Sequence, residues 1–190
     1  MVQEKKLQLN RFDNRSFERG APWWIELIWI GVQALFIASS IPGSTHRKLL
    51  LKLFGAKIGE GVVFKTKIRV KFPWRLRVDD FAWIGESVWI DNLAEVHVHS
   101  NACLSQDVYL CTGSHDWCSP TFDLIVKPVI VGEASWLGAR STVGPGVNIG
   151  EGAVLGLGST TSKDLCSWTI YSGTPAQPVK KRIIAETSED

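Results

Sequence analysis

The chain has 190 residues, of which 45% are hydrophobic, and its formal net charge at pH 7 is +2. This length suits one domain with an appendage, and the near-neutral charge excludes the broad basic surface typical of nucleic-acid-binding proteins, so we expect no nucleic acid partner. The four cysteines form neither a C-x-x-C pair nor a zinc-binding spacing, which indicates reduced thiols in a reducing compartment.

The first 20 residues are polar and lack the layout of a cleavable secretion signal, so we expect a cytoplasmic protein. The next segment, 23–41, is strongly apolar and predicts a helix, which Pro42-Gly43 ends. Its uninterrupted apolar run, 27–41, is about 15 residues long, whereas a membrane-spanning helix needs roughly 20. Three interpretations stay open. The helix packs on the rest of the protein or a neighbouring subunit, lies in a membrane surface through its tryptophans, or spans the membrane.

A second short helix is predicted from Thr45 to about Phe54, with Thr45 capping its start and Gly55 ending it. Its basic residues Arg47, Lys48 and Lys52 suit anionic lipid headgroups, although an ordinary solvated face explains them equally well. Our hypothesis is peripheral contact with the inner face of the cytoplasmic membrane.

The remainder of the chain follows a hydrophobic repeat of six residues, which is the period of neither a helix nor a hairpin. One six-residue unit is a short strand and a turn, and three units make one coil of a parallel β-helix. We expect the aliphatic residue to point inward, the glycine after it to accept the backbone angles of the corner, and the small fifth residue to fit the crowded inner corner. The repeat is most regular at Val131, Leu137, Val143, Ile149 and Leu155, with fifth positions Ser135, Ser141, Val147, Ala153 and Ser159.

Two irregularities interrupt this repeat. A phase slip of two residues near Val96 predicts a bulge or an outward loop at about 97–101. The step from Leu110 to Val131 is 21 residues, which is not a multiple of six, so a segment must leave the column there. That excursion contains the sequence Thr112-Gly-Ser-His-Asp-Trp117.

Further motifs point to a family. The hexapeptide repeat, the Gly-Ser-His loop at 113–115, Ser162-Lys163-Asp164 and the terminal Gly173-Thr-Pro-Ala176 come in that order. Together they resemble the left-handed β-helix O-acetyltransferases of the maltose/galactoside acetyltransferase type. Arg19-Gly20, the Trp-rich helix and the segment 53–59 resemble the exopolysaccharide (colanic-acid-type) branch of that group.

The resemblance implies an all-β fold, a left-handed parallel β-helix over residues 57–190 that carries the acyltransferase activity, preceded by an N-terminal helical segment over residues 1–56. It also implies a homotrimer whose active sites lie between two columns. The implied reaction moves an acetyl group from acetyl-CoA to a hydroxyl of a saccharide or a lipid-linked saccharide precursor.

His115 is the candidate general base, because an imidazole titrates near neutrality and can accept and return a proton. Asp116, next to it, is a candidate for orienting the ring or binding substrate. By resemblance, Asn92 matches an asparagine that touches the acceptor or the thioester. Trp136 is a candidate wall of the acceptor pocket.

The resemblance also places coenzyme A along the late coils, with the backbone N–H of Ala139 as a candidate oxyanion donor. Gln177 stands where relatives often carry a basic residue, which removes one expected phosphate contact. We expect no metal. The candidate cofactor-binding residues are Gly138, Ala139, Gly156, Leu157, Ser162, Lys163 and Lys180.

Three alternatives stay open. His97 and His99 could join His115 in a zinc site, as in the γ-class carbonic anhydrases, although the H-x4-H pair of those enzymes is absent. Cys118 lies three residues after His115 and could form a nucleophilic pair with it. The column could also be a non-catalytic scaffold.

Overall fold

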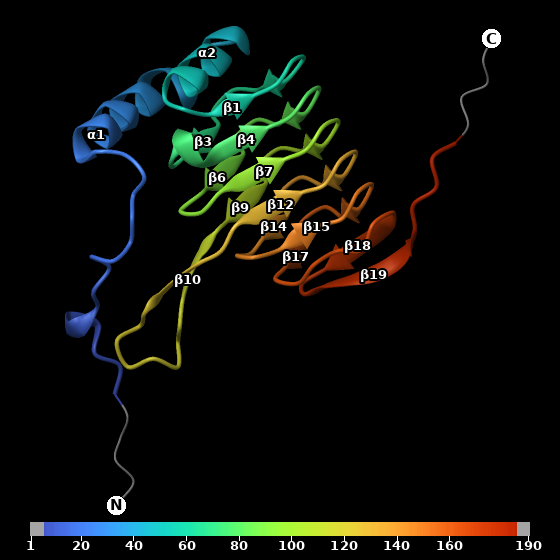
Figure 1. Cartoon of the computed structure of the whole chain (residues 1–190). Helices are drawn as coiled ribbons and strands as arrows, with labels where there is room; N and C mark the ends of the chain where they lie inside the picture. The colour runs from blue at the N-terminus through green and yellow to red at the C-terminus, as the bar shows by residue number, and fades with distance from the viewer. Residues whose placement is uncertain (1–5, 186–190) are drawn as a thin grey trace, which may run out of the picture.

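The computed structural model describes residues 6–185, so the outer ends of the two predicted segments, 1–5 and 186–190, lie outside the described residues. The chain winds into a column whose faces are three sheets of short strands, with the helices at one end (Figure 1). Each coil contributes one strand to each sheet in turn, and we number the sheets 1, 2 and 3 in that order. Strands of successive coils therefore pair in parallel, and Ile84 lies opposite Leu104 in one such pair. The antiparallel pair of β18 (Thr169–Gly173) and β19 (Ala176–Lys181) ends the column.

Sheet 1 consists of β1 (Lys57–Ile58), β4 (Leu76–Val78), β7 (Val96–Val98), β12 (Val129–Val131) and β15 (Asn148–Ile149). Sheet 2 consists of β2 (Val63–Phe64), β5 (Trp83–Ile84), β8 (Cys103–Leu104), β13 (Trp136–Leu137), β16 (Val154–Leu155), β18 (Thr169–Gly173) and β19 (Ala176–Lys181). Sheet 3 consists of β3 (Arg69–Val70), β6 (Trp89–Asp91), β9 (Tyr109–Cys111), β14 (Thr142–Val143) and β17 (Thr160–Thr161).

The predicted fold class, a left-handed parallel β-helix with an N-terminal helical segment, is confirmed. The aliphatic residues of the regular repeat are fully buried, and the small fifth residues are at most 2% exposed. Because equivalent residues of successive coils pair directly, the aliphatic side chains stack into one continuous core along the column.

The reason we gave for the glycines is wrong. Gly132 and Gly138 do not have positive φ; the left-handed residues come two positions later, at Ala134 (φ 53°) and Arg140 (φ 59°). What excludes a side chain is space, because a Cβ at Gly138 would lie 2.7 Å from the backbone nitrogen of Leu157 in the next coil. These glycines therefore permit close stacking of the coils.

The position predicted for the phase slip is also wrong. Residues 96–98 form β7, and the extra residues precede them, at 92–95. Similar insertions occur one coil earlier, at 71–75, where η3 (Pro73–Arg75) forms, and one coil later, at 112–128. The last contains the hairpin of β10 (Gly113–His115) and β11 (Leu124–Val126). All three insertions leave the column where sheet 3 passes into sheet 1, which we call edge 3–1.

The N-terminal helices close the first end of the column (Figure 1). They are α1 (Trp23–Val32), which continues into the π-turn η2 (Gln33–Ile37), and α2 (Thr45–Leu53); a short η1 (Leu9–Arg11) precedes them. Trp29 is buried and donates from Nε1 to the Val70 carbonyl at 2.9 Å, while the Gln33 amide oxygen accepts from the Val70 N–H at 2.6 Å. The helix thus satisfies the exposed hydrogen-bonding groups of edge strand β3. Within residues 6–185 no helix has the length and apolarity needed to cross a membrane.

The sequence suggested that Arg47 could face a lipid surface, but the structure places it inside the protein. Its side chain is fully buried, and this burial lowers the pKa of the guanidinium below its ordinary value. The guanidinium gathers the carbonyl groups that the end of η2 and the following loop leave without helical partners. It donates to the carbonyls of Ile37, Ser39, Ile41 and Gly43.

Replacing Arg47 with alanine should lower the free energy of unfolding by about 3 kcal/mol, because several carbonyls lose a charged donor at once. Chemical denaturation monitored by circular dichroism measures this. Lys52→Ala, an exposed substitution on the same helix, is the matched control and should change stability little. Equal effects of the two substitutions would contradict the role assigned to Arg47.

Candidate active site

His115 is held by two aromatic rings and one carbonyl. It ends β10 on the hairpin at edge 3–1, stacked on Phe122 with ring centroids 4.2 Å apart, and Phe12 meets it edge-on at 5.4 Å. Its Nδ1 lies 2.8 Å from the Phe122 carbonyl oxygen. Since a carbonyl only accepts hydrogen bonds, Nδ1 carries a proton, and Nε2 of the neutral ring keeps a free lone pair. No residue in the described part of the chain bonds to Nε2.

Asp116 does not orient this ring. Its Oδ1 accepts from the backbone N–H of Cys118 at 2.8 Å and so stabilises the hairpin turn, while the Phe122 carbonyl performs the orienting role. Asp116 and Cys118 are both exposed, and none of the contacts described for His115 involves Cys118. A Cys118–His115 nucleophilic pair therefore has no support in the geometry.

An N-terminal segment that the sequence analysis left without a role completes the surroundings of His115. We call residues 6–20 the strap; its Gln8 N–H donates to the Pro120 carbonyl at 2.7 Å, and Phe17 stacks on Phe72. Between the strap and the edge 3–1 loops lies a cavity of about 250 Å³. Its lining includes His115, Asn14, Arg19, Lys71, Leu93 and Leu124. The isolated Phe12 and Phe17 in a polar stretch were the only signal that the strap packs here.

Asn92 precedes Leu93, a lining residue of this cavity, and is fully buried. Its amide oxygen accepts from the Phe72 N–H at 2.9 Å, and its amide nitrogen donates to the Phe72 carbonyl at 2.7 Å. Both polar groups of the side chain are thus used to join two edge 3–1 loops, as buried polar groups require. The structure gives Asn92 a positioning role instead of the direct substrate contact we expected.

Four of the predicted cofactor residues lie on a different edge, where sheet 2 passes into sheet 3. This edge 2–3 is a vertical row of turn residues, each joined to the next coil by a backbone hydrogen bond, including Gly158 N–H to Ala139 oxygen at 2.9 Å. The row runs through Thr66, Glu86, Gln106, Ala139 and Leu157. Gly138 and Gly156 begin the two late turns of this row. The N–H groups of Ala139 and Leu157 bond to no described residue, so both can serve a ligand.

The other predicted residues are divided between further positions. Ser162 and Lys163 are exposed on edge 3–1, the edge of His115. Lys180 is exposed on β19, opposite Ile170. The predicted residues thus lie on both edges that flank sheet 3 and on β19, and within residues 6–185 none of the hydrogen bonds or ring contacts of His115 involves those on edge 2–3.

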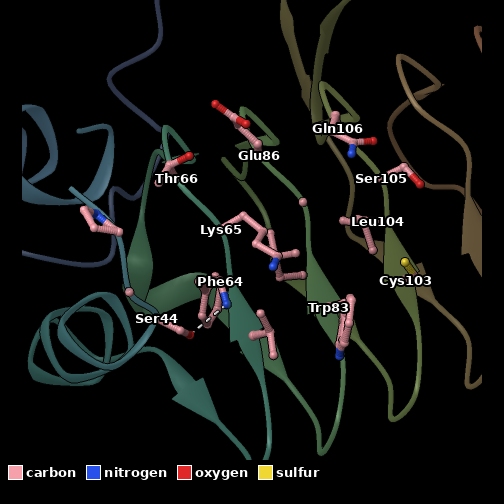
Figure 2. Close-up of a pocket in the computed structure, with 15 residues that line it drawn as sticks. Ser44, Phe64, Lys65, Thr66, Trp83, Glu86, Cys103, Leu104, Ser105 and Gln106 are labelled. Carbon is pink, nitrogen blue, oxygen red and sulfur yellow. Dashed lines mark hydrogen bonds between the residues drawn. The ribbon is translucent and has the colours of Figure 1, made fainter. Parts of the chain in front are cut away.

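Trp136 lies on the outer face of sheet 2, 48% exposed, with its Nε1–H donating to the Ser105 hydroxyl at 2.9 Å. Ser105 lines a cavity of about 610 Å³ on this face, which we call the sheet 2 cavity. The loop 42–44 borders this cavity on the side of the N-terminal helices. Trp83 of β5 and Lys65, which follows β2, also line it (Figure 2). The sheet 2 cavity and the cavity at His115 share no lining residue.

The three-histidine zinc site is not formed. His97 Nε2 and His99 Nδ1 lie 2.7 and 3.2 Å from the same Asp79 carboxylate oxygen on sheet 1. Burial opposes ionisation of Asp79, but hydrogen bonds from His97 and Arg77 outweigh it and hold the Asp79 pKa below its ordinary value. Among the described residues, the group that could hold a metal is Asp79, His97 and His99, without His115.

Comparison with known proteins fits this geometry. No family model matches the chain. A protein named as a colanic acid biosynthesis acetyltransferase, WcaF of Escherichia coli (strain K12), is 39% identical over 172 residues, which cover 90% of this chain and 94% of that protein. The chain belongs to the WcaF family of acetyltransferases.

Solved structures share the fold of this WcaF-family chain at lower identity. The hexapeptide-repeat acetyltransferase VCA0836 of Vibrio cholerae, described in complex with acetyl coenzyme A, superposes with a TM-score of 0.78 at 22% identity, covering 95% of this chain and 98% of that one. A maltose O-acetyltransferase from Clostridium difficile 630 gives a TM-score of 0.73 at 20% identity, covering 85% and 88%. The predicted resemblance to both the maltose type and the colanic-acid branch is confirmed.

The neutral His115 should exist as the Nδ1–H tautomer, because the Phe122 carbonyl can only accept. Two-bond ¹H–¹⁵N correlation spectra of the imidazoles at high pH measure this, with the His115 signals assigned by their loss in His115→Ala. An Nε2–H tautomer in this WcaF-family member would show that the Phe122 carbonyl does not determine the tautomer. The free lone pair would then lie on Nδ1, so Nε2 could not accept a proton.

Proposed function

We propose that this chain transfers the acetyl group of acetyl-CoA to a hydroxyl of a saccharide or lipid-linked saccharide precursor, with His115 as general base. The observation that carries the proposal is the held imidazole: Nδ1 is tied to the Phe122 carbonyl, Nε2 keeps a free lone pair, and the residue lines a cavity. Family membership supports acetyl transfer, and the acetyl-CoA complex of the Vibrio cholerae relative supports the donor.

The proposed chemistry needs one base and one oxyanion donor. Nε2 of His115 accepts the proton of the acceptor hydroxyl as its oxygen attacks the thioester carbonyl carbon, and a tetrahedral oxyanion forms. In this proposal the free N–H of Ala139 stabilises that oxyanion. When the carbon–sulfur bond breaks, His115 returns the proton to the departing thiolate, which leaves an O-acetyl ester and free coenzyme A.

Edge 2–3 suits an extended donor molecule. The coils stack closely at Gly138 and Gly156, and the N–H groups of Ala139 and Leu157 beside them bond to no described residue; we call this part of edge 2–3 the coenzyme A strip. Exposed Lys163, on edge 3–1, and exposed Lys180, on β19, lie outside this strip and can meet the phosphates of a donor that extends beyond it. We therefore keep these residues, together with Ser162, as the proposed coenzyme A contacts.

The division of the site between two edges supports a homotrimer. His115 and the coenzyme A strip flank sheet 3 from opposite sides, so edge 3–1 of one copy must approach edge 2–3 of another to bring them together. A closed ring of three identical columns gives every copy both kinds of contact.

The exposed face of the N-terminal helices supports the proposed membrane contact. One stripe of α1 and η2 packs on the column, while large apolar side chains remain exposed on the other side, such as Trp23 at 70% and Leu27 at 58%. Lys48 and Lys52 of α2 add positive charge on the same end of the column. An apolar surface with nearby basic residues suits the inner face of the cytoplasmic membrane, where anionic lipids and lipid-linked acceptors lie.

His115→Ala should lower kcat by about 10²- to 10⁴-fold, the range that a general base contributes, without changing the oligomer mass. Release of free thiol from acetyl-CoA in the presence of a panel of saccharides measures the rate. His99→Ala removes an exposed imidazole outside the proposed site and should leave the rate within about twofold of the unmodified enzyme. Full activity in His115→Ala would remove His115 from the mechanism.

Replacing both Trp23 and Leu27 with serine should weaken binding to phosphatidylglycerol vesicles by more than about tenfold, because each side chain removes apolar area from the contact. Cosedimentation with the full-length protein measures this. Val179→Ser, an exposed apolar change at the opposite end of the column, is the control. Deletion of the helices is unsuitable, because Trp29, Ile37 and Leu51 belong to the core. Unchanged vesicle binding would disprove the contact, and loss of the oligomer would instead assign this face to a neighbouring subunit.

A further inference from the structure

We infer that the outer face of sheet 1 binds one divalent cation of the zinc type, with Asp79, His97 and His99 as its ligands. The site plays no part in the proposed acetyl transfer, and the inference does not rest on that function. It also differs from the three-histidine site considered above, because a carboxylate takes the place of His115 among its ligands.

The first step is a departure from the glycine repeat. The residues that directly follow the strands of sheet 1 form a row, in which each N–H bonds to the next coil, as Asp79 does to the Val98 carbonyl at 2.8 Å. A Cβ at Gly132 in this row would lie 2.6 Å from the Ile149 carbonyl oxygen, so the coils stack closely there. The row consists of Gly59, Asp79, His99, Gly132 and Gly150. The two residues that are not glycine lie on successive coils, which makes their side chains neighbours.

The second step is the position of His97. It is the middle residue of β7 and faces outward between the buried Val96 and Val98. Because β7 pairs with β4 on one side and β12 on the other, the backbone that carries His97 is held from both sides. The register places His97 opposite Arg77, two residues before Asp79, so its ring reaches the Asp79 carboxylate.

The third step is the geometry of the three side chains. His97 Nε2 and His99 Nδ1 lie 2.7 and 3.2 Å from the same oxygen, Asp79 Oδ2, and the three ligand atoms all lie within 4.8 Å of one another. In a tetrahedral zinc site with bonds of 2.0–2.1 Å, the ligand atoms are about 3.3 Å apart. Both nitrogen–oxygen separations are therefore already within about 0.6 Å of those that a zinc ion needs.

The surroundings orient the carboxylate and leave a way in for a cation. Arg77 Nε donates to Asp79 Oδ1 at 3.0 Å, which leaves Oδ2 for the two rings. Outer contacts of this kind orient the ligands of metal sites. The His99 side chain is 39% exposed, so a cation can enter from solvent and keep a water molecule as its fourth ligand.

The fourth step is the chemistry of the ligands. Two imidazoles and one carboxylate suit Zn²⁺, Co²⁺ and Ni²⁺, whereas Mg²⁺ and Ca²⁺ prefer oxygen ligands alone. Each neutral imidazole would bind through the nitrogen that faces Asp79 and keep its proton on the other nitrogen. Asp79 follows β4 and the histidines belong to the next coil, at β7, so a bound cation links two coils of the column.

Zinc should bind to the full-length protein, after dialysis against a chelator, at one ion per chain with a Kd of about 10 µM or tighter. Isothermal titration calorimetry measures this, and millimolar Mg²⁺ should not compete. Asp79→Asn, His97→Gln and His99→Gln should each weaken zinc binding about tenfold or more, because each removes one ligand while nearly preserving the size of the side chain.

His115→Ala is the matched control, since it removes an imidazole from the hairpin and should leave the zinc affinity unchanged. Two-bond ¹H–¹⁵N imidazole spectra give a second readout, in which zinc should shift the His97 and His99 signals and leave those of His115 in place. Circular dichroism and the oligomer mass check that each variant is folded. If one ligand variant does not fold, the other two and the spectra of the unmodified protein decide.

Three results would overturn the site. Zinc binding weaker than about 10 µM, or an affinity unchanged in the folded ligand variants, would leave a cluster held by hydrogen bonds alone. Loss of zinc affinity in His115→Ala would return the ion to a three-histidine site. None of these results bears on acetyl transfer, which the activity of His115→Ala tests separately.

Discussion

Every feature of this protein depends on the parallel hydrogen bonding between successive coils. Because a strand residue of one coil pairs with the equivalent residue of the next, side chains at equivalent positions form straight rows along the column. The inward rows make the core, and the turn residues make the edges. An edge can stay flat only where the turns have equal length, and an edge can carry loops only where residues are inserted. Edge 2–3 is the flat case and holds the proposed coenzyme A strip, whereas edge 3–1 has inserted residues and holds the proposed base on its hairpin.

The same hydrogen bonding creates a problem at the first coil, which has no coil before it. Its open strands need partners, and the N-terminal helices supply them through Trp29 and Gln33. The π-turn and loop needed to place these helices leave several carbonyls without partners, and Arg47 gathers them. A segment that could be taken for a membrane anchor is therefore first a structural cap. Only the side of it that does not face the column is available for a lipid surface.

The fold could be predicted from the sequence because burial of one aliphatic side chain in six sets a period that no other structure shares. The details of the turns could not. Between Ile90 and Val98 the count shows two extra residues but not which turn holds them, and the structure puts them before Val96. Arg47 was misplaced because a charged residue on an amphipathic helix usually meets solvent, whereas its partners here are carbonyls that only the three-dimensional loop brings together. His115 was identified by its motif, but its orienting group is a backbone carbonyl seven residues later, and no side-chain pattern encodes that.

The separation of the proposed base from the proposed coenzyme A strip, on different edges of one column, has a consequence for the proposed chemistry. A thioester next to an activated base also reacts with water, and a site that excludes water protects it. In an isolated chain the strap and Phe122 shield His115 on one edge, while the coenzyme A strip lies open on another. In the proposed homotrimer, base and thioester come together where two columns pack, and that packing also removes water from between them. In this proposal assembly completes the site, which gives a reason for a hairpin long enough to leave the column to carry the proposed base.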